Sequence, residues 1–191
     1  MYKILIYLIT FTFAIGQDYS LSFDGVDDYV SINPFNRANS LDLTINVHAK
    51  GKGTMTCPQT PEYESYFNYY NDENNNDIVF HLGIHTPESG HHWSVEEDLS
   101  TDYQFYTITI DDLDNGSTLA EIFINGVSLG QHTYPYSIPS YSYLEIGRNL
   151  VEGNGLYIGS ISEIQMWNRM LSVEEINDNM STSPTGNEDG L

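Results

Sequence analysis

The sequence predicts an all-β protein, a two-sheet antiparallel jelly-roll sandwich with one short C-terminal helix. Three observations lead to this prediction: runs of β-branched and aromatic residues recur along the chain, turn-forming residues separate them, and a helix start signal occurs late. Many short strands with a single brief helix are typical of two packed antiparallel sheets.

The first predicted strands, 19–23 and 29–32, flank the turn-rich stretch Asp24-Gly25-Val26-Asp27-Asp28. Residues 78–85 alternate in the period-two pattern of a half-exposed strand. Asn-Gly pairs at 115–116 and 125–126 are strong hairpin signals. The remaining predicted strands are 106–110, 119–124, 127–129, 143–147 and 156–167.

The one predicted helix begins at Ser172, because a serine followed three residues later by Glu175 forms a capping box. After the helix, residues 181–191 are rich in Ser, Thr, Gly and acidic residues and include one proline. We interpret this segment as a linker or as the truncated start of a further segment.

Residues 1–16 have the features of a secretory signal peptide: an early Lys3, an apolar run and small residues before a cut at Gln17. The run is too short to cross a bilayer comfortably, and no later segment predicts a membrane span. The mature chain is therefore expected to be secreted and extracellular, with attachment at the cell surface left open.

The chain carries 27 acidic and 6 basic residues, a net charge of −21. Such a charge repels phosphates, so nucleic acid and anionic membranes are not expected as partners. Cys57 is the only cysteine, which excludes an internal disulfide.

Four segments resemble laminin-G-like, concanavalin A-like jelly-roll modules in sequence and in order along the chain. These are the opening strand pair 21–30, the Asn-Gly hairpin 122–127, and the closing stretches 144–149 and 159–172. The resemblance implies that residues 17–180 form a laminin-G-like jelly-roll domain. It also implies noncovalent recognition of a carbohydrate, glycoconjugate or extracellular protein, within a larger polypeptide carrying further domains.

The resemblance also implies a structural calcium between the first and last strands. Two positions depart from the family pattern: His48 stands near a usual tryptophan, and Ser162 stands where the family often has an aspartate. Aspartates in the turn after the first predicted strand still offer the oxygen ligands that calcium prefers. The alternative interpretation is that these aspartates only cap a tight turn through local hydrogen bonds. The predicted metal ligands are Asp24, Asp27, Asp28 and Glu163.

The chain has fifteen tyrosines, and aromatic rings on a sheet surface can stack on sugars. Alternation places Tyr66 and Tyr70 on one face with Asn68 between them, and Trp93 is a candidate extension of this patch. These four residues are the predicted ligand-binding set. The alternative interpretation is ordinary sheet structure, because strands favour tyrosine.

Four histidines offer a second metal hypothesis. His81 and His85 share one strand face, and a turn after them can return His91 and His92 to their side. The alternative is a polar, partly exposed strand face.

The sequence predicts no enzyme. Jelly-roll glycosidases resembling this fold place catalytic carboxylates as Glu-x-Asp-x-x-Glu on one strand, and no such run occurs here. The leading hypothesis is a glycan-binding module, the second a structural or protein-interaction spacer. A glycan-active hydrolase or lyase is a minor alternative, since fold sharing alone does not establish activity.

Overall fold

A computed structural model describes residues 20–32, 42–59, 64–72, 77–85, 90–96, 100–137, 143–148 and 156–191. In part of these segments the description covers the backbone and not the side chains, namely at 57–59, 64–72, 77–85, Tyr143 and most of 90–96. The strands are β1 (Leu21–Asp24), β2 (Val30–Ile32), β3 (Leu43–Gln59), β4 (Glu64–Asp72), β5 (Asp77–His85), β6 (Gly90–Glu96), β7 (Gln104–Leu113), β8 (Ser117–Ile124), β9 (Val127–Tyr134), β10 (Tyr143–Ile146) and β11 (Ile158–Trp167). The helix of these segments is α1 (Val173–Ser181).

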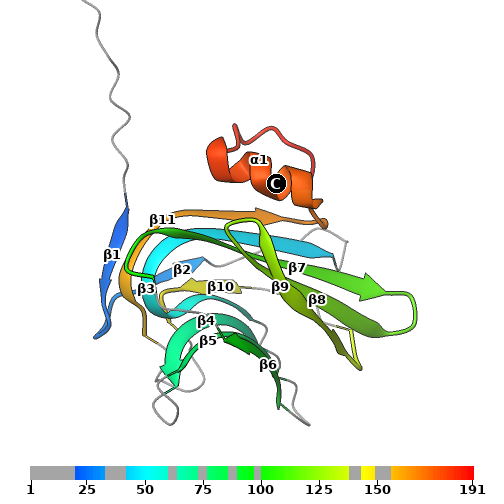
Figure 1. Cartoon of the computed structure of the whole chain (residues 1–191), viewed down its shortest axis with the longest axis horizontal. Coiled ribbons are helices and arrows are strands. Elements are labelled where there is room, and N and C mark those ends of the chain that lie inside the picture. Colours follow the sequence, from blue (N-terminus) through cyan, green and yellow to red (C-terminus); the bar gives the residue numbers. More distant parts are fainter. Residues whose placement is uncertain are drawn as a thin grey trace, which may run out of the picture.

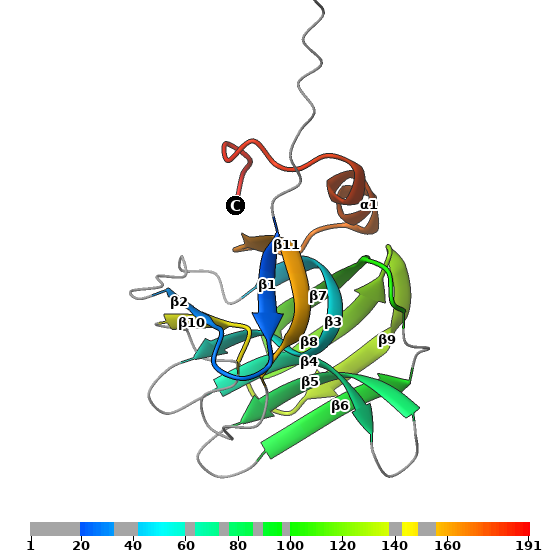
Figure 2. The same cartoon turned by 90° about the vertical axis from the view of Figure 1, so that its left-hand side faces the viewer.

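The strands form two antiparallel sheets that share β3. The first sheet has the order β1-β11-β3-β7-β8-β9 and the second β2-β10-β3-β4-β5-β6. Figures 1 and 2 show the two layers, with β1 beside β11 on one side and β6 near β9 on the other. The predicted all-β sandwich with one short C-terminal helix is confirmed.

Strand β3 passes from one sheet into the other. Up to residue 52 it pairs with β11, and from residue 53 onward it pairs with β4 and β10. Gly51 and Gly53 lie at this crossing with φ of 131° and 113°. A Cβ on Gly51 would lie 2.1 Å from the Ile158 carbonyl oxygen of β11. Any side chain at this position would therefore clash, and the close approach of the two backbones requires glycine.

The main hydrophobic core lies between the sheets. Alternate residues of β3 point into it, in the period-two pattern of a strand, and Thr44 and Asn46 between them are buried on the opposite face. β7 and β8 supply Ile108 and Ile122, both fully buried, and Tyr106 and Tyr134 are buried as well. The core residues of β3 are Leu43, Ile45, Val47, Ala49 and Met55.

Helix α1 covers the outer face of the first sheet (Figure 1). Ile176 of the helix and Leu171 before it pack on Phe105, Phe123 and Trp167 of the sheet, forming a second apolar cluster. The predicted capping box is present, because Ser172 Oγ accepts from the Glu175 N–H and the Glu175 carboxylate accepts from the Ser172 N–H. No helix in the described segments has the length and apolar character needed to cross a bilayer.

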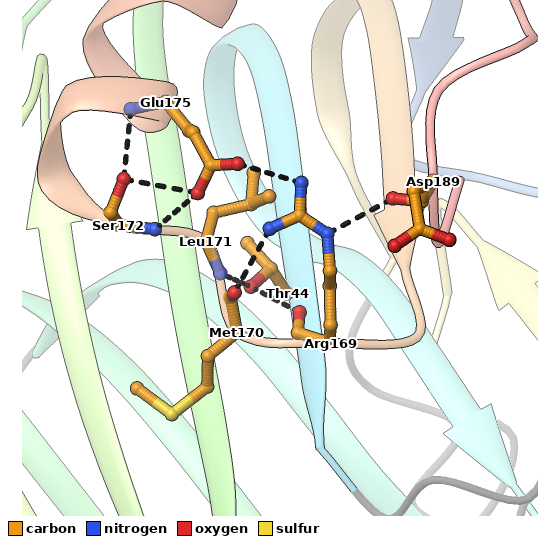
Figure 3. A network of polar contacts seen from close by, with 7 residues as sticks. All are labelled: Thr44, Arg169, Met170, Leu171, Ser172, Glu175 and Asp189. Carbon is orange, nitrogen blue, oxygen red and sulfur yellow. Dashed lines mark hydrogen bonds and ion pairs between the residues drawn. The ribbon is translucent and has the colours of Figure 1, made fainter.

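A polar cluster around Arg169 joins the helix, β3 and the C-terminal segment (Figure 3). The Arg169 guanidinium donates to Glu175 Oε1 at 2.7 Å and to the Asp189 carbonyl at 2.9 Å. The Asn168 N–H donates to the Gly190 carbonyl at 2.6 Å. Residues 181–191, predicted as a linker or the start of a further segment, are thus hydrogen-bonded to the domain on the helix side (Figure 2).

Candidate functional site

The first predicted metal ligands come together in the turn after β1. Carboxylate oxygens of Asp24, Asp27 and Asp28 lie within 4.8 Å of one another, and all three residues are exposed. Asp24 Oδ1 accepts from the Val26 N–H at 2.8 Å, and Asp28 Oδ2 accepts from the Asp24 N–H at 3.0 Å. The carboxylates therefore cap the turn and also offer the hard oxygen donors that suit calcium.

Glu163, the fourth predicted ligand, is not part of this group. Strand register pairs Asp24 with Ile158 of β11, whereas Glu163 pairs with His48 of β3. Glu163 is five residues beyond Ile158, which corresponds to roughly 17 Å along a strand. The two carboxyl-bearing segments are neighbours in strand order but are separated along the strand.

The predicted sugar-binding patch does not assemble as one row. Trp93 is in register with Leu82, and Leu82 with Phe67, so Trp93 lies one position out of step with Tyr66, Asn68 and Tyr70. Alternate rows of a sheet face opposite sides, which separates Trp93 from that set. The side chains of Tyr66, Asn68 and Tyr70 lie outside the described part of the structure.

Trp93 instead links β6 and β9, the last described strands of the two sheets. Its indole is half-buried against the main core and stacks on His132 of β9, with ring centroids 5.8 Å apart and planes 18° apart. His132 in turn meets Tyr134 edge-on at 4.7 Å. Trp93 therefore helps to hold β6 against β9.

The four histidines of the second metal hypothesis lie on β5 and β6. Register places His92 opposite Gly83, between His81 and His85, and His91 opposite Ile84. Whether the imidazoles converge depends on side chains outside the described part, so this hypothesis stays a prediction.

A cavity of about 580 Å³ lies on the outer face of the first sheet, beside the C-terminal end of α1. Its wall combines an aromatic ring with hydroxyl, imidazole, amide and carboxylate groups from β3, β11, the segment before β7, and the end of the helix. Its lining residues include His48, Tyr103, Ser162, Glu163, Asn179 and Ser183.

The rings of His48 and Tyr103 stand against each other in this cavity, with centroids 4.9 Å apart and planes 33° apart. The Lys50 ammonium lies 4.9 Å from the Tyr103 ring centroid, a cation–π distance. Ser162 Oγ lies 2.7 Å from His48 Nδ1 and donates to the His48 carbonyl at 3.1 Å. These contacts hold the imidazole and the phenol ring against each other in the cavity wall.

Glu163 lines the same cavity. Its Oε1 accepts from Gln165 Nε2 at 3.0 Å and its Oε2 accepts from Ser183 Oγ at 3.1 Å. The residue predicted as a calcium ligand is thus held between a strand neighbour and the C-terminal segment.

Sequence reasoning identified Glu163 for another role and did not identify Tyr103, Asn179 or Ser183. Alternation along β3 is the only local signal, because His48 and Lys50 alternate with the core residues Val47 and Ala49. The other cavity residues come from distant parts of the chain and share no local pattern.

The two layers, the shared strand and the helix-covered face define a jelly-roll module of the concanavalin A-like class. The chain belongs to the Laminin_G_3 family, described as the concanavalin A-like lectin/glucanases superfamily, whose model matches residues 23–177. No curated protein gives a significant match to the chain.

Solved structures share the fold at low sequence identity. A heptameric SAP-like pentraxin from Limulus polyphemus has a TM-score of 0.60 at 16% identity, covering 84% of this chain and 80% of that one. Domain 4 of an extracellular arabinanase from Geobacillus stearothermophilus, in complex with arabinotriose, has a TM-score of 0.51 at 12% identity, covering 84% and 86%. A botulinum neurotoxin DC binding domain in complex with SialylT has a TM-score of 0.59 at 14% identity, covering 85% of this chain and 41% of that one.

Proposed function

We propose that the chain is an exported module that binds carbohydrate noncovalently, with the cavity beside α1 as its binding site. The composition of the cavity wall is the observation that carries the proposal. Tyr103 offers a half-exposed aromatic ring, and hydroxyl, amide and carboxylate groups line the same cavity. A polyhydroxylated ring presents apolar C–H groups and many donors and acceptors, which such a wall can satisfy together.

The size of the cavity supports this proposal, because about 580 Å³ falls in the range of small-molecule sites. The arabinanase domain and the neurotoxin domain were both solved with bound ligands, arabinotriose in the first case. They support the proposal only through the shared jelly-roll fold, since at this identity a fold does not specify a site.

The leader-like residues 1–16 support an extracellular location, and we propose no catalytic role. The alternative, a structural or protein-interaction spacer, predicts that the chain retains no glycan in the cavity. A binding experiment with variants of the wall separates the two.

The test is a glycan array, run once with calcium and once with a chelator. We expect retention of a subset of glycans by the wild-type chain and loss of it in Tyr103→Ala. Tyr70→Ala is the matched control, because Tyr70 belongs to the patch predicted on β4 and not to the cavity. Absence of retention in both conditions would overturn the proposal, and loss in Tyr70→Ala alone would move the site to β4.

A further inference from the structure

A buried row of hydrogen bonds crosses the first sheet and ends in the cavity. Thr107 Oγ1 of β7 donates to Asn46 Oδ1 of β3 at 2.7 Å, and Asn46 Nδ2 donates to Gln165 Oε1 of β11 at 2.8 Å. Gln165 Nε2 then donates to Glu163 Oε1 at 3.0 Å. Thr107, Asn46 and Gln165 are 0%, 1% and 4% exposed.

The direction of this row is fixed by its chemistry. The carboxylate of Glu163 can only accept, so Gln165 must donate its Nε2 to it and accept from Asn46 at its Oε1. This leaves Asn46 Oδ1 to accept from the Thr107 hydroxyl. Buried polar groups are costly unless they are satisfied, and satisfied networks are rigid. The row therefore delivers one fixed N–H donor to the carboxylate of Glu163.

The C-terminal segment holds the same carboxylate from the other side. Ser183 Oγ donates to Glu163 Oε2 at 3.1 Å, and Ser183 lies beyond the family-matched residues 23–177. The segment that carries Ser183 is anchored at its far end by Asn168 and Arg169, which donate to the Gly190 and Asp189 carbonyls. Glu163 is thus fixed in orientation before any ligand arrives.

We propose that Glu163 is the principal ligand acceptor of the cavity, positioned by the Thr107–Asn46–Gln165 row and by Ser183, and that it selects neutral saccharides over acidic ones. This inference rests on the proposed function. A carboxylate only accepts hydrogen bonds, and each of its oxygens has accepting capacity beyond the bond already made. Sugar hydroxyls donate to it, and because both oxygens are held in place, a ligand loses little by ordering them.

An acidic saccharide meets two repulsions in this cavity. The nearer is Glu163 itself, and the second is the net charge of −21 on the whole chain. The opposing feature is Lys50 beside Tyr103. Register pairs Lys50 with Ser160 and Glu163 with His48, so this cation lies further along β3 than the carboxylate.

The experiment is affinity electrophoresis of the full chain in gels containing soluble polysaccharides. The neutral probes are arabinan, galactomannan and β-glucan, and the acidic probes are polygalacturonate and alginate. We expect retardation by at least one neutral probe and by neither acidic one. Glu163→Gln is expected to weaken that retardation by about tenfold or more, the effect of losing charged hydrogen bonds.

Variants of Ser183 test whether this residue positions the Glu163 carboxylate. We expect Ser183→Ala to weaken the retardation several-fold and Ser183→Thr, which keeps a hydroxyl, to restore it. Thermal denaturation of each variant separates a lost contact from a lost fold, and the melting temperature of the Ser183 variants should stay near that of the wild type.

Retardation by the acidic probes alone, abolished in Lys50→Gln, would overturn the inference and leave carbohydrate binding standing. Wild-type behaviour of Glu163→Gln, or failure of Ser183→Thr to restore what Ser183→Ala loses, would overturn it as well. Absence of retardation by every probe would contradict the proposed function itself.

Discussion

The guanidinium of Arg169 lies 2.7 Å from the carboxylate of Glu175, in the first turn of α1. This hydrogen bond, together with the Ser172 N–H, lowers the pKa of Glu175 to about 2. Because Arg169 also donates to the Asp189 carbonyl, one side chain connects the start of the helix to the end of the chain. Stability at this corner of the molecule should therefore depend on pH.

A carboxyl with a lowered pKa stabilises the fold fully above its unfolded pKa, and the stabilisation is lost as the pH falls through the folded value. For Glu175 this window runs from about pH 4.5 down to about pH 2. The side chains of Arg169 and Glu175 are 33% and 40% exposed, so solvent screening limits the pair to about 1 kcal/mol. We expect Glu175→Gln to lower the free energy of unfolding by that amount at pH 7 and by almost nothing at pH 2.

Urea denaturation at several pH values measures this difference, with Glu174→Gln as the control. Glu174 neighbours Glu175 on the helix but is exposed. A Glu175→Gln effect that is equally large at pH 2 and pH 7 would contradict the assignment to charge.

The stacked pair of Trp93 and His132 should contribute to stability by joining β6 to β9. We expect Trp93→Ala to lower the free energy of unfolding by about 2 kcal/mol, less than the loss for a fully buried tryptophan, because the indole is half-buried. His132→Phe keeps a ring at the stacking position and is expected to be much milder. Hydrogen exchange should be faster at the β6 and β9 amides in Trp93→Ala; unchanged exchange there would argue against a role at this edge.

The aspartate turn should bind calcium weakly. Extracellular modules bind calcium at roughly 0.1–1 mM. At about 10 mM calcium such a site adds about 1.4–2.7 kcal/mol, or roughly 3–10 °C in melting temperature. Asp27→Asn should remove this shift without lowering the melting temperature in chelator, because the two turn-capping bonds of the site use Asp24 and Asp28. A calcium shift that persists in Asp27→Asn would place the ion elsewhere.

The crossing of β3 should tolerate no side chain at Gly51. Gly51→Ala places a methyl group against the backbone of β11, and we expect a loss of about 3 kcal/mol or more, or failure to fold. Gly116→Ala is the matched control, since Gly116 also has a positive φ but has no atom within 4 Å of the position that a methyl group would take. We expect about 1 kcal/mol there. If both variants lost a similar amount of unfolding free energy, the positive φ alone, and not the contact with β11, would explain why glycine is needed at position 51.

Local features of the fold were predictable because short stretches of chain determine them. The turn at Asn125-Gly126 has φ of 50° and 74°, the left-handed pair that this dipeptide favours, and the capping box of Ser172 and Glu175 forms as expected. The length of β3 was not predictable, because glycines weaken a strand and Gly51 and Gly53 therefore indicate, from the local sequence, that the strand ends there. Only the approach of β11 shows why glycines continue it.

By itself the sequence determined the all-β class from patterns along the whole chain, and it determined the late helix and the cluster of Asp24, Asp27 and Asp28 within a few residues each. Tertiary structure alone decided that Glu163 lies apart from that cluster and accepts a hydrogen bond from Ser183. It also decided that Trp93 lies one position out of register with Tyr66 and Tyr70. The physical reason is strand register. Alternation fixes which face a residue takes, but the packing of distant segments fixes which residues lie opposite one another.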